Sequence, residues 1–398
     1  MVKRFVSFML IFIMIFAAGC KNVESSMDKQ VTEEVRISRP TEEEITAIKN
    51  LLSREEQYAR ALDLESYIAL LPAGDNELIK EQTNWFNDLK LEPVEEFSIK
   101  YLDSKKINED FKVYIEQSYK RDGRRFSSSF FKRLVVKEGK LYDAGNYFDE
   151  ISNGRFIVKY TEQNKALAED ILENLDIIFD EFAVTWDIVP DRKIVVKMFD
   201  DREALRHSIK LSMWACSGWY EFGESIRMYI SDNDKVRTIN NVLRHELVHL
   251  FTMLKTNGNL PYWLAEGLAT NYQNTRGPES LYNLRESFKG KYLSVDELEA
   301  MELEKLTNRD EIHDYYMNSQ MLVSFIIENY GILSLYSILD ELGSRPNPKE
   351  GTGHENDKLY REYLHEALPK VLGLESYEVF KKLWLKSIKE HKALKSQT

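Results

Sequence analysis

The first patterned stretch of the chain, residues 41–150, changes character at Pro93. Before this proline, apolar residues recur three or four positions apart, which predicts a helix with one buried face. Beyond it, apolar and polar residues alternate, which predicts strands closed by a turn at Lys137-Glu138-Gly139. The helical stripe comprises Ile45, Ile48, Leu52, Tyr58 and Leu62, and the alternating positions are Phe97, Ile99, Tyr101, Phe111, Val113, Ile115 and the run from Phe131 to Val136.

The second stretch starts near Arg155 and mixes both patterns. Alternation predicts strands over 156–160, 193–199 and 226–230, and a long amphipathic period predicts a helix over 164–186. From Val295 onward the pattern is helical, with a loop at 345–358 where prolines and glycines gather. These elements predict an α+β fold with an accessory domain over 41–150 and a second domain over 151–398.

The segment His245-Glu246-Leu247-Val248-His249 contains residues that could bind a metal ion. On a helix two histidines four apart stand one above the other, so both imidazoles can reach one metal ion. Glu246 lies at the edge of the same face. The opposite arc is apolar and predicts the buried side of this helix: Leu243, Leu247, Leu250, Phe251 and Leu254.

A third ligand is offered by Glu266, in a helix that opens after Gly258-Asn259 with Pro261 in its first turn. A third histidine six residues after His249 is excluded, because Lys255 occupies that position. Gly267 inside a helix costs about 1 kcal/mol relative to alanine, which predicts that another backbone packs close beside Glu266. Two histidines and one glutamate with an open fourth position form a typical catalytic zinc site.

With HELVH followed by PYWLAEGLA, the chain resembles the gluzincin metallopeptidases of the peptidase MA-like type. The segment from Tyr316 to Phe325, ending at Tyr330-Gly331, is similar to the tyrosine-bearing helix of gluzincin aminopeptidases. The resemblance implies one Zn²⁺ held by His245, His249 and Glu266. It also implies a catalytic Tyr316 that donates to the oxyanion, and Tyr315 takes this role if the register differs by one.

The resemblance also implies an architecture and a reaction. Strands before the motif and helices after it are the layout of a thermolysin-like domain, and the helix and meander of 41–150 resemble nuclear transport factor 2-like domains. In the implied reaction Glu246 is the general base of peptide hydrolysis, and Thr270 and Asn271 are possible outer partners of the ligands. The aminopeptidases carry a glutamate motif before the motif helix that binds the free amino terminus of the substrate. This motif is absent here, and 223–230 reads instead as a strand that lines a cleft. An endopeptidase is therefore favoured.

The amino terminus predicts where in the cell the protein is located. Lys3 and Arg4 precede an apolar run that ends in Ala17-Ala18-Gly19-Cys20, which has the layout of a secretory signal and resembles a bacterial lipobox. We expect a signal peptide over 1–19, lipidation of Cys20, a flexible tether over 20–40 and a protein anchored outside a bacterial cell membrane. A plain secretory signal is the alternative. Cys216 then has no partner for a disulfide and reads as a small buried residue.

The net charge of the chain limits the kinds of partner that it can be expected to bind. The net charge is −12, and loss of Lys3 and Arg4 with the signal leaves −14, which argues against nucleic acid. The expected partners are a peptide or protein substrate and the membrane, and the oligomeric state stays open. Two other hypotheses remain: a zinc-containing lipoprotein that binds a partner without cleaving it, and a transporter's substrate-binding lipoprotein. His313 and His354 are read as surface residues.

Overall fold

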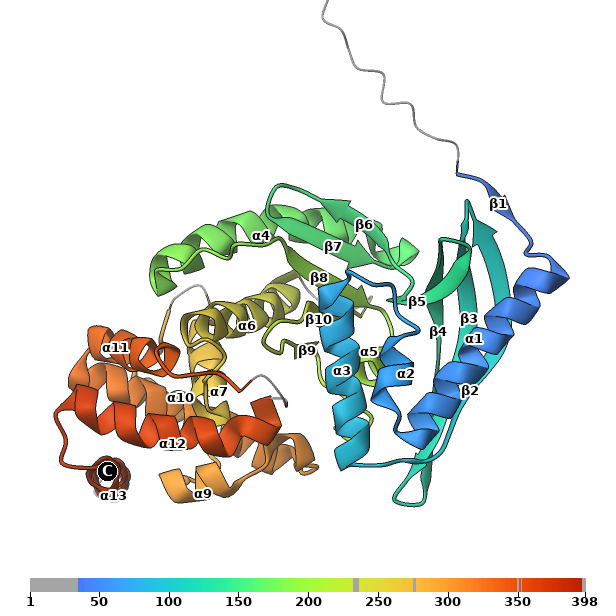
Figure 1. The fold of residues 1–398 in the computed structure, drawn as a ribbon. Helices are drawn as coiled ribbons and strands as arrows, with labels where there is room; N and C mark the ends of the chain where they lie inside the picture. The colour runs from blue at the N-terminus through green and yellow to red at the C-terminus, as the bar shows by residue number, and fades with distance from the viewer. Residues whose placement is uncertain (1–34, 232–235, 275–276, 349–350, 352, 396–398) are drawn as a thin grey trace, which may run out of the picture. The chain divides into compact units, whose positions relative to one another are not determined.

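The computed structural model describes residues 35–231, 236–274, 277–348, 351 and 353–395, and residues 37–398 form one compact unit. The predicted signal peptide 1–19 and lipidated Cys20 lie outside the described residues. The fold is a mixed α+β fold, as expected, with one antiparallel sheet, one mixed sheet and a helical carboxyl-terminal part (Figure 1).

The amino-terminal part is an antiparallel sheet packed against helices, as the sequence predicts. Its strands lie in the order β1-β2-β3-β4-β5, and Glu138 and Gly139 form the β4–β5 turn with positive φ. The expected tether over 20–40 is too long, because Ile37 and Ser38 already pair with β2. The elements are β1 (Ile37–Ser38), α1 (Glu42–Ala61), α2 (Leu64–Ile68), α3 (Asn76–Leu91), β2 (Glu95–Ile107), β3 (Asp110–Arg121), β4 (Arg124–Lys137) and β5 (Lys140–Asn146).

The second sheet has the order β6-β7-β8-β10-β9, and its two inner pairings are parallel. The helix α4 (Lys165–Trp186) connects β7 to β8, as parallel neighbours require. The expected domain boundary at 150 falls inside β6, which pairs with β7. The strands are β6 (Asp149–Ser152), β7 (Phe156–Tyr160), β8 (Ile194–Phe199), β9 (Gly218–Trp219) and β10 (Ile226–Tyr229).

The two faces of this sheet bury different chemistry. Val196 and Met198 of β8 join the apolar core that also contains α4 and α6 (Val236–Lys255). Lys197, between them in sequence, points to the opposite face, because side chains alternate along a strand. There α3 and α5 (Arg202–Ile209) lie between the two sheets (Figure 1).

Buried polar contacts join α3 to the second sheet. The Nζ of Lys197 donates to both carboxylate oxygens of Glu81, at 2.9 and 2.7 Å. Glu81 also accepts from the backbone N–H and the hydroxyl of Ser225, just before β10. Asn84 donates to Glu224 at 2.6 Å. The amino-terminal part is therefore fixed to the strands that precede the motif helix.

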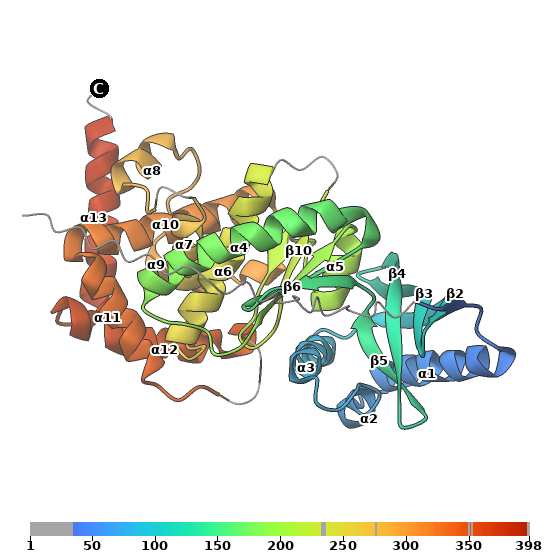
Figure 2. The same cartoon turned by 90° about the horizontal axis from the view of Figure 1, so that it is seen from above.

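The carboxyl-terminal part is helical from α7 onward, and α11, α12 and α13 lie at the end away from the first sheet (Figures 1 and 2). The loop expected over 345–358 is shorter, because helix resumes at Gly353. No single described helix is long and apolar enough to cross a membrane; α10 and α11 pass only together, across a 115° bend. The helices are α7 (Tyr262–Tyr272), α8 (Leu281–Ser287), α9 (Val295–Ala300), α10 (Arg309–Tyr330), α11 (Ile332–Gly343), α12 (Gly353–Leu372) and α13 (Tyr377–Lys395).

We expect Glu81→Gln to lower the free energy of unfolding by about 3 kcal/mol at pH 7, because Lys197 would stay buried without its counterion. Burial raises the pKa of Glu81, but Lys197, Arg227 and the hydrogen bonds outweigh it and lower the pKa to about 2. The carboxylate therefore contributes stability that is full above pH 4.5 and is lost as pH falls toward 2. Urea denaturation at pH 7 and pH 3 measures this, and the difference between variant and parent should shrink at pH 3.

The matched control is Glu302→Gln, which removes an exposed ion pair with Lys305. Exposed pairs contribute about 0–1 kcal/mol, so this variant should unfold at nearly the parent's midpoint. Equal effects of the two substitutions would mean that the buried contact does not hold α3 to the sheet.

Candidate metal centre

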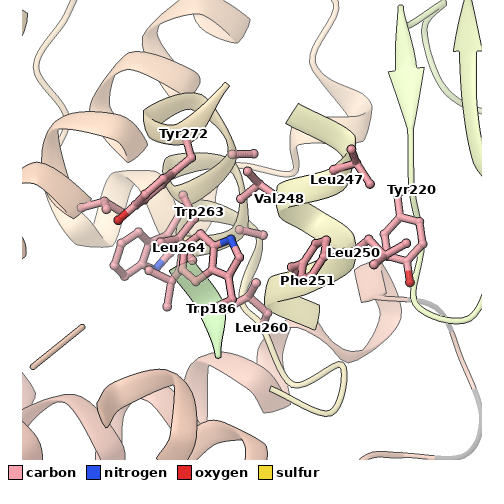
Figure 3. Packing of buried hydrophobic residues seen from close by; sticks show 14 of the residues in the cluster. Trp186, Tyr220, Leu247, Val248, Leu250, Phe251, Leu260, Trp263, Leu264 and Tyr272 are labelled. Atoms are coloured by element: carbon pink, nitrogen blue, oxygen red, sulfur yellow. The ribbon is translucent and has the colours of Figure 1, made fainter. Parts of the chain in front are cut away.

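The motif helix α6 presents its two histidines on one side and packs with the other. The rings of His245 and His249 lie 4.8 Å apart between centroids at 78° to each other. On the opposite side Leu247 and Phe251 are fully buried, as the apolar arc predicts. Figure 3 shows apolar side chains on two sides of α6, with Val248 toward Trp263 of α7 and Leu247 on the side of Tyr220. The helix is thus fixed by its apolar face while its imidazoles face a cavity.

Glu266 of α7 meets both imidazoles. Its Oε2 lies 3.2 Å from Nε2 of His245 and 3.6 Å from Nε2 of His249. Two ligands bound tetrahedrally at 2.0–2.1 Å from one ion lie roughly 3.3 Å apart, so both separations suit a shared ion. Among the described residues, this is the one cluster of three or more histidine, cysteine or acidic residues whose ligand atoms, here within 4.8 Å of one another, could hold a metal.

Close backbone packing holds Glu266 in place. A Cβ built on Gly267 would lie 2.4 Å from the carbonyl oxygen of Ser319 in α10, which confirms the predicted close approach. One turn later, Asn271 donates to the carbonyls of Gly267 and Gln320 at 2.8 and 3.0 Å. Helix α7 is therefore pressed against α10 directly beside the candidate ligand.

The protonation of these side chains follows from this arrangement. Burial raises the pKa of Glu266, but the charges and hydrogen bonds of His249 and His245 outweigh it and lower the pKa to about 2. Burial lowers the pKa of His245, but its hydrogen bond to Glu266 outweighs it and raises the pKa to about 9. An ionised Glu266 is thus held by an imidazolium, and a divalent cation would replace the proton.

The outer partners differ from those suggested by the sequence. Nδ1 of His245 lies 3.2 Å from Oε1 of Gln273, an orienting contact that the sequence analysis missed. Asn271 ties α7 to α10 instead, and the buried hydroxyl of Thr270 and Nδ1 of His249 have no hydrogen-bond partner among the described residues. One of the two histidines is therefore oriented through the side chain of Gln273, the residue that directly follows the helix of Glu266.

Glu246 lies in the same cavity, against the edge strand β9. A Cβ built on Gly218 would lie 2.3 Å from Oε1 of Glu246, so only glycine leaves room for the carboxylate in this position. Glu246 is 5% exposed. Burial raises the pKa of its carboxyl group, while both histidines oppose the rise. A carboxylate with a raised pKa next to the ligands has the properties of a general base.

Counted together with its open mouth, the cavity has a volume of about 740 Å³, and its lining includes the three candidate ligands, Glu246 and Tyr316. The rings of Tyr316 and His245 are 6.2 Å apart, whereas Tyr315 is buried outside the lining. Burial raises the pKa of Tyr316 well above its usual value, so the hydroxyl keeps its proton. The register of α10 thus favours Tyr316 over Tyr315, although the helix begins seven residues earlier, at Arg309.

Residues between 213 and 221 form one wall of the cavity. The sequence had instead predicted that 223–230 would line it. The strand predicted to line the cleft, β10, is one position in from the edge, and β9 takes its place. A two-residue strand has no measurable period, so in the sequence only Gly218, next to Trp219, marks this segment. The wall consists of Met213, Trp214, Cys216, Gly218, Trp219, Tyr220 and Glu221.

The remaining residues behave as the sequence suggests. Cys216 is a free, buried thiol in an apolar cluster, and burial raises its pKa to about 12. His313 is exposed, as expected, whereas His354 is half-buried and lies 3.6 Å from Glu302 rather than at the cluster. Neither histidine contributes to the metal site.

Comparison with known proteins adds no relative: the chain matches no protein-family model, and no curated protein is significantly similar to it. The properties of the site are therefore inferred from the residues and their geometry.

We expect the protein to bind one divalent ion per chain, and His245→Ala, His249→Ala and Glu266→Ala each to weaken binding by at least about 100-fold. Loss of an outer partner alone costs 10–100-fold, and a ligand contributes more. Elemental mass spectrometry after dialysis against limiting metal gives the stoichiometry. The matched control is His313→Ala, which should bind metal like the parent; full occupancy in the Glu266 variant would contradict the three-ligand site.

Proposed function

We propose that this protein hydrolyses peptide bonds as a zinc-dependent metallopeptidase. The observation that carries the proposal is the meeting of His245, His249 and Glu266 in one cavity that also holds the carboxylate of Glu246. The donor set supports zinc, because two imidazoles and one carboxylate are a common catalytic zinc set, and the ligand-atom separations fit it. When bound, zinc supplies Lewis-acid chemistry: it polarises a carbonyl and acidifies a water molecule.

The residues of the chain account for the proton movements. Glu246 lies beside the ligands and can accept a proton from the attacking water and pass it to the leaving amine. The protonated hydroxyl of Tyr316 faces the same cavity and can donate to the oxygen that becomes negative as the carbonyl is attacked. Gln273 orients His245 for metal binding through the contact at its other ring nitrogen.

The edge strand supports a peptide as the substrate. In the part of the chain that the structure describes, β9 is the last strand of its sheet and pairs with β10 alone. Its free edge can pair with an extended peptide through backbone hydrogen bonds, as other sheets do in peptide recognition. Gly218 in this strand touches Glu246, so a peptide paired there would pass the general base. An endopeptidase remains the favoured form.

Family and location complete the proposal. The motif helix, the Glu266 helix and the Tyr316 helix, packed after a small sheet, support a gluzincin with a thermolysin-like catalytic domain. The first sheet and its helices support a nuclear transport factor 2-like accessory domain. Lipidation at Cys20 would place the enzyme at the outer face of a bacterial membrane. The alternative of a non-cleaving binding lipoprotein leaves Glu246 in the cavity without a role.

We expect Glu246→Gln to keep bound zinc and to lower the turnover of a peptide library by at least about 100-fold, because the amide cannot take up the proton. Mass spectrometry of cleavage products and of metal content measures both. If the parent, like the variant, retained zinc but cleaved no peptide, the alternative of a binding lipoprotein would be favoured.

We expect Tyr316→Phe to lower kcat by about 100-fold with little change in KM, because its hydrogen bond forms mainly in the transition state. Tyr315→Phe is the matched control and should leave kcat within about twofold of the parent. A larger loss in the Tyr315 variant would move the oxyanion role to that residue.

A further inference from the structure

The core of the amino-terminal part contains a buried cluster of three charged side chains. Nζ of Lys132 in β4 donates to Oε1 of Glu55 in α1 at 2.5 Å and lies 2.7 Å from Oδ2 of Asp143 in β5. At most 7% of each side chain is exposed. One cation is thus shared by two carboxylates. When both carboxylates are ionised the cluster has an excess negative charge, which is costly in the interior of a protein.

The two carboxylates of this cluster are not equivalent. Asp143 uses both of its oxygens, because Oδ1 accepts the N–H of Gly145 at 2.9 Å while Oδ2 contacts Lys132. Glu55 uses only one oxygen: its Oε2 is buried and has no hydrogen-bond partner among the described residues. A carboxylate oxygen without a partner is costly to keep charged. The excess charge is therefore relieved most readily by a proton on Glu55.

The elements packed against α1 supply no second cation for Glu55. These elements are α2, β2 and β5. From α2 the phenol of Tyr67 lies near both carboxylates, but its hydroxyl donates to Gln82 of α3. In the part of the chain that the structure describes, β2 supplies no charge that acts on Glu55. Burial raises the pKa of Glu55; Lys132 partly offsets this rise, Asp143 adds to it, and the pKa reaches about 7.

We propose that the uptake of one proton by Glu55 strengthens the packing of α1 against the amino-terminal sheet, which makes this part of the protein sensitive to pH. The proton comes from solvent and leaves a neutral cluster of Glu55 as the acid, Asp143 as the carboxylate and Lys132 as the ammonium. No step involves the metal cavity, so the inference is independent of the proposed function. Because the pKa is higher in the folded protein than its ordinary value of 4.5, the added stability is full below pH 4.5 and is lost as pH rises through about 7.

The experiment is amide hydrogen exchange of the full chain, measured by mass spectrometry at pH 6 and pH 8. The readout is the protection of the α1 amides after correction for the effect of pH on the intrinsic exchange rate. A group with a pKa of about 7 in the folded state and 4.5 in the opened state should make the parent's protection about tenfold higher at pH 6 than at pH 8. Glu55→Gln should show the same protection at both pH values, within about twofold.

A matched control and a second variant separate titration from packing. Glu43→Gln changes an exposed glutamate of the same helix and should keep the parent's tenfold difference. Asp143→Asn leaves one carboxylate for one lysine, and its amide oxygen can still accept the N–H of Gly145. Glu55 should then stay ionised at both pH values, so the tenfold difference should disappear although Glu55 is intact.

Equal protection of α1 at pH 6 and pH 8 in the parent would overturn the proposal. A tenfold difference that persists in Glu55→Gln would also overturn it, since another group would then bind the proton. If Glu55→Gln has an unprotected α1 at both pH values, Asp143→Asn decides: loss of the difference supports the proposal, and an unchanged difference rejects it.

Discussion

The structure depends on keeping the carboxylate of Glu266 ionised while it is buried. An unpaired buried carboxylate would be neutralised or expelled, and two imidazoles at 3.2 and 3.6 Å prevent this. The same contacts demand that α6 and α7 keep a fixed spacing and rotation. Gly267 makes this possible, because it lets the backbone of α10 approach α7 closely. The packing of α6, α7 and α10 and the ionised state of Glu266 therefore depend on each other.

The features of the fold and of the site that could be predicted from the sequence are those fixed by residues close together in the chain. The α6 and α7 helices, their ligands and the close approach at Gly267 follow from local spacing and from residue types that are costly elsewhere. Gln273 was not predictable, because its contact with His245 depends on how α7 is rotated against α6. β9 was missed for another reason: a strand of two residues has no period, and its position is set by pairing with β10.

The choice between Tyr315 and Tyr316 shows the same limit. Neighbouring residues on a helix point about 100° apart, so the sequence can identify the helix and leave the face open. Packing decides, because α10 must turn Ser319 toward Gly267. Once that contact is fixed, Tyr316 falls at the cavity and Tyr315 falls in the core. The face that α10 turns toward the cavity is thus set by a backbone contact away from the cavity.

The amino-terminal part belongs to the site more closely than a spacer would. Glu81 holds Ser225 at the start of β10, β10 pairs with β9, and Gly218 of β9 touches the carboxylate of Glu246. Each step is a hydrogen bond or a contact without room for a methyl group, so a shift of α3 is passed on to the wall of the cavity. The loop that carries Glu221 lies between β9 and β10, and it is held by the same contacts.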